Sequence, residues 1–140
     1  MLARLQKIKE WLTALPCKAT LDKEQKVLVV SLHEAILMIE ARQYADEWLY
    51  LFTAHVSFYT RLTPDLMRLL LSNSQHLHIG TPRVEEEGLY LRHTLFEDEL
   101  NPQTLLKVVG NLAIASQNLT AHIISAFGGI SPIEYFSRQR

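Results

Sequence analysis

The chain has very little cysteine, since Cys17 is the only one among its 140 residues. A single thiol excludes an intrachain disulfide, and a chain without disulfides fits a reducing compartment. No stretch approaches the roughly 20 apolar residues that a membrane-spanning helix needs. Residues 1–10 interleave charged and apolar side chains, unlike the continuous apolar core of a signal peptide. We therefore expect a cytoplasmic protein with no membrane partner.

The chain also lacks a surplus of charge of either sign. Its 14 Lys and Arg residues face 15 Asp and Glu residues, which gives a formal net charge of -1. A protein that binds nucleic acid through its phosphates needs a basic face, whereas the basic residues here are scattered. A local basic cluster occurs only at the end of the chain, with Arg138 and Arg140. We expect no nucleic-acid partner.

The overall composition is that of an ordinary folded domain. Hydrophobic residues make up 48% of the sequence and charged residues 21%. A chain of this length fits one domain and can bury roughly 70% of its unfolded surface. The sequence predicts a single α+β domain over residues 1–129 and a short C-terminal helical tail over residues 130–140.

Three proline-based signals mark helix starts. Proline is favoured at the first helical position, and a Ser, Thr or Asn before it can cap the free backbone N–H groups. These signals are Thr63-Pro64, Asn101-Pro102 and Ser131-Pro132. Together with an apolar stripe of helical spacing over residues 2–15, they predict four helices, of which the last is short.

Runs of apolar, β-branched and aromatic residues predict the strands. A three-stranded antiparallel meander precedes the second helix and a pair of strands follows it, over residues 26–32, 35–41, 47–59, 75–85 and 89–97. In the third strand, alternate residues from Trp48 to Phe58 are all apolar, so this face is expected to meet the helices. The predicted order is α-β-β-β-α-β-β-α, an antiparallel sheet packed with helices, plus the short extra helix.

Histidine offers the best candidates for chemistry. His76 and His78 are two residues apart on a predicted strand, so they share a face and could bind zinc with a third ligand. His93 is the obvious third ligand, but it has the parity of Leu89 and Leu91, which should face inward. Regular strands therefore place His93 opposite the pair, and only a β-bulge would bring the three together. A metal- or ligand-binding protein or enzyme that uses His76 and His78 is the alternative function.

Other reactive groups lack the context that catalysis needs. Cys17 has no histidine near it in the sequence, and a pair formed in space with His33 or His55 is the alternative. The carboxylates of residues 85–87 and 97–99 lie in turns, where water keeps them ionised, and an acidic docking patch is their alternative role. We predict no catalytic, cofactor-binding or metal-binding residues, and no cofactor.

One part of the chain carries a family resemblance. The segments Glu87–Arg92 (EGLYLR) and Leu100–Leu105 (LNPQTL) resemble the YbjN-family pattern of a strand, a loop and a proline-started helix. The predicted order of elements is similar, over about the whole chain, to the fold shared by that family and the type III secretion chaperones. This resemblance implies a small, mostly dimeric protein that binds other proteins and has no established catalytic residues. In the secretion-chaperone branch, the partners would be extended segments of another chain.

Surplus apolar surface leads to the predicted function. The third strand, the second helix and the final helix offer more apolar positions than one small sheet needs, and large exposed apolar patches usually mark interfaces. We expect a non-catalytic protein-binding module, chaperone-like or regulatory, that acts as a homodimer and binds another protein or an extended peptide. The candidate dimer or partner surface consists of Trp48, Tyr50, Phe52, Leu66, Leu69 and Leu70.

Overall fold

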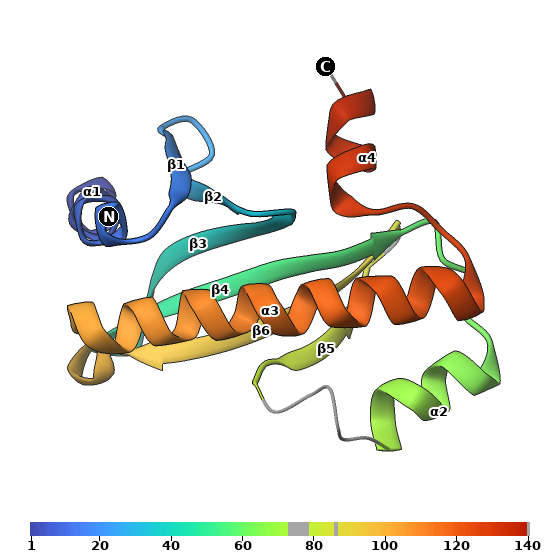
Figure 1. Cartoon of the computed structure of the whole chain (residues 1–140). Coiled ribbons are helices and arrows are strands. Elements are labelled where there is room, and N and C mark those ends of the chain that lie inside the picture. The colour runs from blue at the N-terminus through green and yellow to red at the C-terminus, as the bar shows by residue number, and fades with distance from the viewer. Residues whose placement is uncertain (73–78, 86, 140) are drawn as a thin grey trace.

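The computed structural model of the protein describes residues 1–72, 79–85 and 87–139, and its helices and strands are labelled in Figure 1. Two single turns of 3-10 helix, η1 and η2, join longer elements. In chain order the elements are α1 (Leu2–Trp11), η1 (Leu12–Ala14), β1 (Cys17–Asp22), β2 (Val27–Leu32), β3 (Ala35–Tyr44), β4 (Glu47–Phe58), α2 (Pro64–Ser72), β5 (Thr81–Val84), β6 (Gly88–Phe96), η2 (Glu97–Glu99), α3 (Pro102–Phe127) and α4 (Pro132–Arg138).

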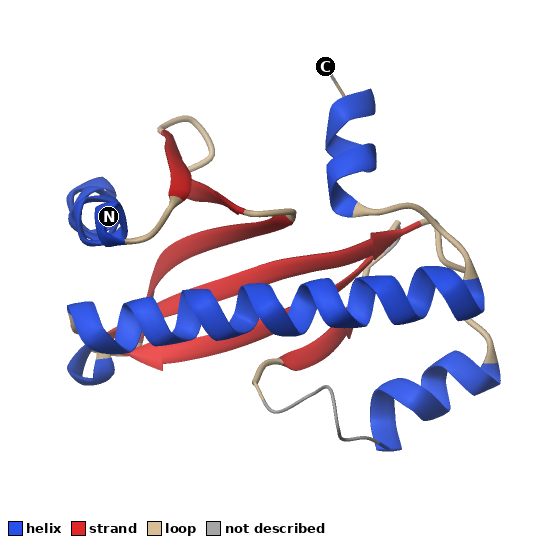
Figure 2. Cartoon of the chain, in the orientation of Figure 1, coloured by secondary structure: helices blue, strands red, loops and turns tan. Residues whose placement is uncertain are grey.

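The strands form one antiparallel sheet of six, in the order β1-β2-β3-β4-β6-β5. The first four strands make a meander, and β6 then pairs with β4 so that the short β5 forms the far edge. The long helix α3 lies across one face of the sheet (Figure 2), and α1 packs beside it against β1, β2 and β3. The fold is therefore α+β with an antiparallel sheet packed with helices, as the sequence predicts.

The sheet contains one strand more than the five that were predicted. The additional strand is β1, which pairs with β2 in a register that places Thr20 opposite Val29. Its inward residues Cys17 and Ala19 are small, and they alternate with the exposed Lys18 and Thr20. Strand signals rest on β-branched and aromatic residues, so this pattern of small and polar residues was missed.

The strand predicted over residues 75–85 is shorter where the structure describes it. Strand β5 covers Thr81–Val84 only, whereas Gly80 before it has φ +85° and forms part of a bend. Residues 75–78 lie outside the described residues. The edge of the sheet is thus a four-residue strand that includes Pro82, a residue that sheets tolerate at their edges.

The core lies between the sheet and the helices α1 and α3. Helix α3 begins where predicted, because the side chain of Asn101 accepts a hydrogen bond from the Thr104 N–H at 2.9 Å and Pro102 fills the first turn. Its buried residues follow helical spacing and meet the predicted inward face of β4. The buried residues of that strand face are Tyr50, Phe52, Ala54 and Val56.

A β-bulge changes the alternation near the end of β4. His55 pairs with Tyr90 and Ser57 pairs with Leu89, so Val56 is an extra residue on its strand. Phe58 lies outside the core cluster, and its ring stacks on His55 with the centroids 5.5 Å apart. The prediction that Phe58 shares the face of Trp48 is therefore wrong, since strict alternation holds only in a regular strand.

The chain turns back after α3 and places α4 on the second face of the sheet. Gly128 and Gly129 make the turn with φ of +82° and +99°, values that favour glycine. Ile130 then forms two backbone hydrogen bonds with Phe58, at 2.9 and 3.0 Å. Helix α4 is the short helix predicted within residues 130–140, and it contacts β3 and β4. Figure 1 shows it directed away from α3.

Candidate binding groove

An aromatic cluster gathers around His55 on the second face of the sheet. The bulge in β4 brings the ring of Phe58 to the histidine, and α4 brings Phe136, whose ring centroid lies 5.2 Å away. Tyr90 on β6 approaches edge-on at 6.4 Å. Tyr135 of α4 stacks on the other side of Phe58. Segments far apart in the sequence thus build one wall of rings.

His55 is held neutral by this environment. Its Nε2 atom is buried and has no hydrogen-bond partner among the residues that the structure describes. Burial disfavours the charged form and lowers the pKa of His55 to about 4, against an opposing contribution from the Glu85 carboxylate. At neutral pH the ring is therefore an apolar, polarisable surface without charge.

A groove of about 850 Å³ opens beside this cluster, and we call it the aromatic groove. It lies between α4, the end of β4 and the turn from β5 to β6. Its ring side chains are His55, Phe58, Tyr90 and Tyr135. Its rim adds the exposed aliphatic side chains of Leu62 and Val84 and the carboxylates of Glu85 and Glu87.

A second groove of about 280 Å³ continues along the same face of the sheet. It shares His55, Glu85 and Tyr90 with the aromatic groove, so the two spaces adjoin. Its floor includes Thr53, to which the guanidinium of Arg92 donates at 3.4 Å. Together the two grooves form a continuous strip across β4 and β6 that is aromatic at one end and polar at the other.

Tyrosine hydroxyl groups position both rim carboxylates of the aromatic groove. The Tyr90 hydroxyl donates to Oε1 of Glu85 at 2.8 Å, and the Tyr135 hydroxyl donates to Oε2 of Glu87 at 3.0 Å. Burial and this hydrogen bond raise the pKa of Tyr90, and its hydrogen bond to Glu87 raises the pKa of Tyr135. Both tyrosines stay protonated at neutral pH and hold the carboxylates at the rim.

The predicted partner residues take part mainly in the protein's own core. Tyr50, Phe52, Leu66 and Leu70 are buried. Trp48 and Leu69 are half-buried and pack against the same core cluster. Near them the exposed apolar residues are instead Leu62, Met67 and Leu71. The predicted dimer itself stays a prediction.

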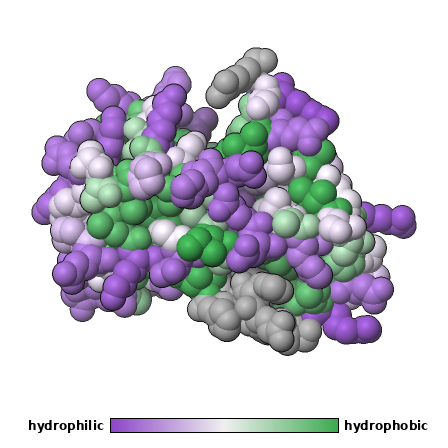
Figure 3. All heavy atoms as spheres, viewed as in Figure 1, coloured by the Kyte–Doolittle hydropathy of each residue, from purple (hydrophilic) through white to green (hydrophobic). Residues whose placement is uncertain are grey.

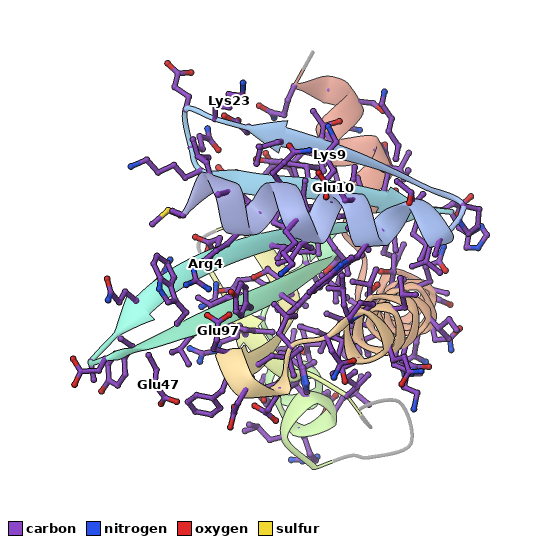
Figure 4. All side chains as sticks on the ribbon, turned by 90° about the vertical axis from the view of Figure 1, so that its left-hand side faces the viewer. Arg4, Lys9, Glu10, Lys23, Glu47 and Glu97 are labelled. Atoms are coloured by element: carbon purple, nitrogen blue, oxygen red, sulfur yellow. The ribbon has the colours of Figure 1, made fainter. Side chains whose placement is uncertain are left out.

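Two of these residues belong to a charged cluster that joins α1 to the sheet. The Tyr50 hydroxyl accepts from the guanidinium of Arg4 at 2.9 Å and donates to both carboxylate oxygens of Glu97 at 3.1 Å. Arg4 also forms an ion pair with Glu97 and lies 4.4 Å from the ring centroid of Trp48. Figure 4 shows Arg4 and Glu97 directed toward each other from α1 and η2. This cluster stabilises the fold.

The histidine alternative falls partly outside the structure. His76 and His78 lie outside the described residues, so the metal site that they could form stays a prediction. His93 is opposite Phe52 in the register of β4 and β6, and it shares the parity of Leu91 as predicted. Within residues 1–72, 79–85 and 87–139, no three His, Cys, Asp or Glu side chains are placed to hold a metal ion.

Cys17 does not have the surroundings of a reactive thiol. Its Sγ atom donates to the carbonyl oxygen of Leu12 at 3.5 Å, and burial raises the pKa of the thiol. A reactive cysteine needs the opposite shift, because the thiolate is the nucleophile. The arrangement therefore favours a packing role for Cys17.

The aromatic groove was not predicted from the sequence. Strict alternation places Phe58 on the wrong face, and the sequence pattern places Tyr135 and Phe136 in a C-terminal tail without indicating where it docks. The usable signal was the pair Gly128-Gly129, because two successive glycines permit the turn that carries the following helix back onto the sheet.

No known family model matches the chain, and no curated protein matches it. In the part of the chain that the structure describes, no helix has the length and apolar character to cross a membrane.

Proposed function

We propose that the protein is a non-catalytic, cytoplasmic protein-binding module that holds a segment of another polypeptide in the aromatic groove. The observation that carries this proposal is the groove of about 850 Å³ walled by Phe58, Tyr90 and Tyr135. Aromatic residues, and tyrosine in particular, are enriched in protein interfaces because they combine a large apolar ring with a polar end. The adjoining second groove extends the contact surface along the sheet, which suits an extended chain.

The polar groups of the groove support binding in preference to catalysis. A general base must lie within hydrogen-bond reach of the proton that it removes, and a second group usually orients it. The Nε2 atom of His55 has no hydrogen-bond partner among the described residues, so no described group holds this nitrogen in place as a base. Glu85 and Glu87 accept hydrogen bonds from tyrosines and lie at the exposed rim. These groups present acceptors and ring faces to a bound segment.

The family resemblance supports the same proposal. The resemblance of Glu87–Arg92 and Leu100–Leu105 to the YbjN family and the type III secretion chaperones implies a small protein that binds other proteins, and on this basis we propose a relationship to them. The YbjN branch leaves the partner open. The first of these segments begins in the turn at the rim of the aromatic groove and continues into β6. The fold differs from the expected order by the additional strand β1. Neither nucleic acid nor a membrane is a partner in this proposal.

A homodimer is the second part of the proposal. The accessible surface of the chain is 8316 Å², whereas a compact monomer of this mass exposes about 7,400 Å². Helix α2 buries Leu66 inward and exposes Met67 and Leu71. A two-fold contact would bring the same exposed residues of two copies together. By contrast, apolar patches on the side crossed by α3 are separated by polar residues (Figure 3).

Site-specific crosslinking tests the binding proposal. The photoreactive residue p-benzoylphenylalanine replaces either Leu62, at the groove rim, or Ile114, on the outer side of α3. The two positions are similarly exposed, at 49% and 57%, which makes them a matched pair. We expect a discrete crosslinked polypeptide from the Leu62 position in cells, and its loss when Tyr90→Ala is added. The proposal would be contradicted if the Leu62 and Ile114 positions gave the same crosslinked polypeptides, or if the Leu62 position gave no crosslink.

Sedimentation separates the dimer from the binding function. The natural protein is expected to sediment as a dimer at micromolar concentration, and the variant Met67→Glu/Leu71→Glu as a monomer. Both residues are exposed, so the variant should fold. A monomeric natural protein at high micromolar concentration would remove the dimer from the proposal and leave the groove in place.

A further inference from the structure

We infer that the aromatic groove recognises a lysine or arginine side chain flanked by apolar residues in the partner polypeptide. This inference rests on the proposed function and specifies the chemistry of the segment that is bound. It joins Glu85 and Glu87 to the groove, whereas the sequence alone assigns these carboxylates to solvent or to an acidic docking patch.

The charge of the groove has one sign. Among its described lining residues, Glu85 and Glu87 are the charged ones, and both are carboxylates. His55 adds no positive charge, because burial keeps it neutral at neutral pH. Arg83 and Arg92 act electrostatically on the Tyr90 hydroxyl from outside the groove, and neither side chain lines it. The second groove differs, since Arg42 and Arg92 balance Glu40 and Glu85 there.

Hydrogen bonds position the two carboxylates of the groove. Each accepts a tyrosine hydroxyl hydrogen bond, at 2.8 Å for Glu85 and 3.0 Å for Glu87. Neither forms an ion pair within the described residues, where the ion pairs involve Arg4, Arg42, Arg68 and Arg138 with other carboxylates. The hydroxyl donors fix the carboxylates beside the rings without neutralising their charge.

Rings and carboxylates together are the surroundings that a cationic side chain prefers. A lysine or arginine head group is attracted to the face of an aromatic ring, and a carboxylate adds a charge-assisted hydrogen bond. The same protein already shows such a contact on the neighbouring side of Tyr90, where the Arg92 guanidinium lies 5.4 Å from the ring centroid. On the side that faces the groove, Tyr90, Tyr135 and the two carboxylates could make the same kind of contact with a lysine or arginine side chain of the partner polypeptide.

The rim explains the apolar flanks of the bound segment. Leu62 and Val84 border the groove and are 49% and 42% exposed. Residues on either side of the cation would cover these side chains and remove their apolar surface from water. An acidic or purely polar segment would meet two like charges or leave this surface uncovered.

Two synthetic peptides test the inference by nuclear magnetic resonance titration. The probes are acetyl-Leu-Lys-Leu-Lys-Leu-amide and its neutral counterpart acetyl-Leu-Gln-Leu-Gln-Leu-amide. We expect the lysine peptide to bind more tightly and to shift the signals of Tyr90 and Tyr135. The variant Glu85→Gln/Glu87→Gln should weaken its binding by about tenfold, as expected for two exposed charge contacts beside aromatic rings. Glutamine can still accept both tyrosine hydrogen bonds, so the groove keeps its shape.

A matched variant controls for the change in net charge. Glu24→Gln/Asp98→Asn removes two exposed carboxylates away from the groove and should change the affinity by less than about twofold, because salt screens distant charges. Equal affinities of the two peptides at the groove would overturn the cation inference and leave the proposed function standing. If neither peptide shifts Tyr90 or Tyr135 at millimolar concentration, both the inference and the proposed function fail.

Discussion

The ring of Tyr135 lies flat on the ring of Phe58, with centroids 3.7 Å apart and planes inclined by 7°. This contact joins α4 to the end of β4 and forms one wall of the aromatic groove. Its two residues are 77 positions apart in the sequence (135 − 58). Stability of the C-terminal helix and access to the groove are therefore coupled through one pair of rings.

Truncation of Tyr135 should loosen α4. We expect Tyr135→Ala to lower the free energy of unfolding by about 1–2 kcal/mol, because an aromatic pair contributes about 0.5–1.5 kcal/mol beyond the area that it buries. Tyr135→Phe keeps the stacked ring and loses only an exposed hydrogen bond to Glu87, so it should cost much less than the alanine substitution. Urea denaturation of the two variants provides the measurement. Equal destabilisation by both would show that stacking contributes little.

Gly129 should not tolerate a side chain. A Cβ atom there would lie 2.3 Å from Oγ1 of Thr60 and 2.8 Å from the carbonyl oxygen of Phe58, at a φ of +99°. We expect Gly129→Ala to release α4 from β4 and to expose the turn to limited proteolysis. The strain of a non-glycine residue in this conformation alone costs about 1–3 kcal/mol.

Gly110 provides the control for that substitution. It lies inside α3, and a Cβ atom there would meet no atom within 4 Å. Gly110→Ala is expected to stabilise the protein by about 0.5–1 kcal/mol, because alanine is the better helix former. Thermal unfolding of both variants measures the contrast. A stable Gly129→Ala protein with intact α4 signals would contradict the proposed role of the turn.

His55 should make the protein less stable in acid. Its pKa is about 4 in the folded protein, below the ordinary value of 6.5. Because the folded-state pKa is lowered, the contribution of the neutral ring is present above pH 6.5 and is lost as the pH falls toward 4. The loss amounts to about 3 kcal/mol by linkage.

His55→Phe isolates this contribution. The phenylalanine ring does not titrate, so the variant should lose less stability than the natural protein between pH 6.5 and 4. Chemical denaturation at several pH values in this window measures the difference in slope. Parallel pH profiles for the two proteins would show that His55 is charged or solvated in the folded state.

Tyr50 tests the cluster that joins α1 to the sheet. Its hydroxyl bonds to Arg4 and Glu97 while its ring is buried. Tyr50→Phe should therefore cost about 1–2 kcal/mol, as expected for partly buried hydrogen bonds to charged groups. Tyr44 is 72% exposed, and Tyr44→Phe should change the stability by less than about 0.5 kcal/mol. Equal effects of the two substitutions in urea denaturation would contradict a stabilising role for the cluster.

Local sequence signals predicted the parts of the fold that depend on local structure. Asn101-Pro102 and Ser131-Pro132 begin helices because capping and the fixed φ of proline act within one turn. Strand β1 is not predicted because Cys17 and Ala19 are only half-buried and have little apolar character of their own.

The candidate site depends on long-range structure, and this limited its prediction. The bulge at Val56 arises from the pairing of β4 with β6, a strand that begins 30 residues after β4 ends at Phe58 (88 − 58). Docking of Phe136 near His55 depends on that bulge and on the turn after α3. The bulge and the turn after α3 are far apart in the sequence, so no local pattern includes both. The sequence therefore predicts which strand or helix carries each ring but not that the rings meet.

The order of strands has a consequence for synthesis of the chain. Strand β4 acquires its second neighbour only when β6 has left the ribosome, after α2. Until then β4 is a 12-residue edge with buried-type residues on both faces, the kind of edge that promotes aggregation. A nascent chain that pauses before Gly88 therefore exposes β4 as an aggregation-prone edge strand. We expect fragments that end there to need a chaperone, whereas the full chain should not.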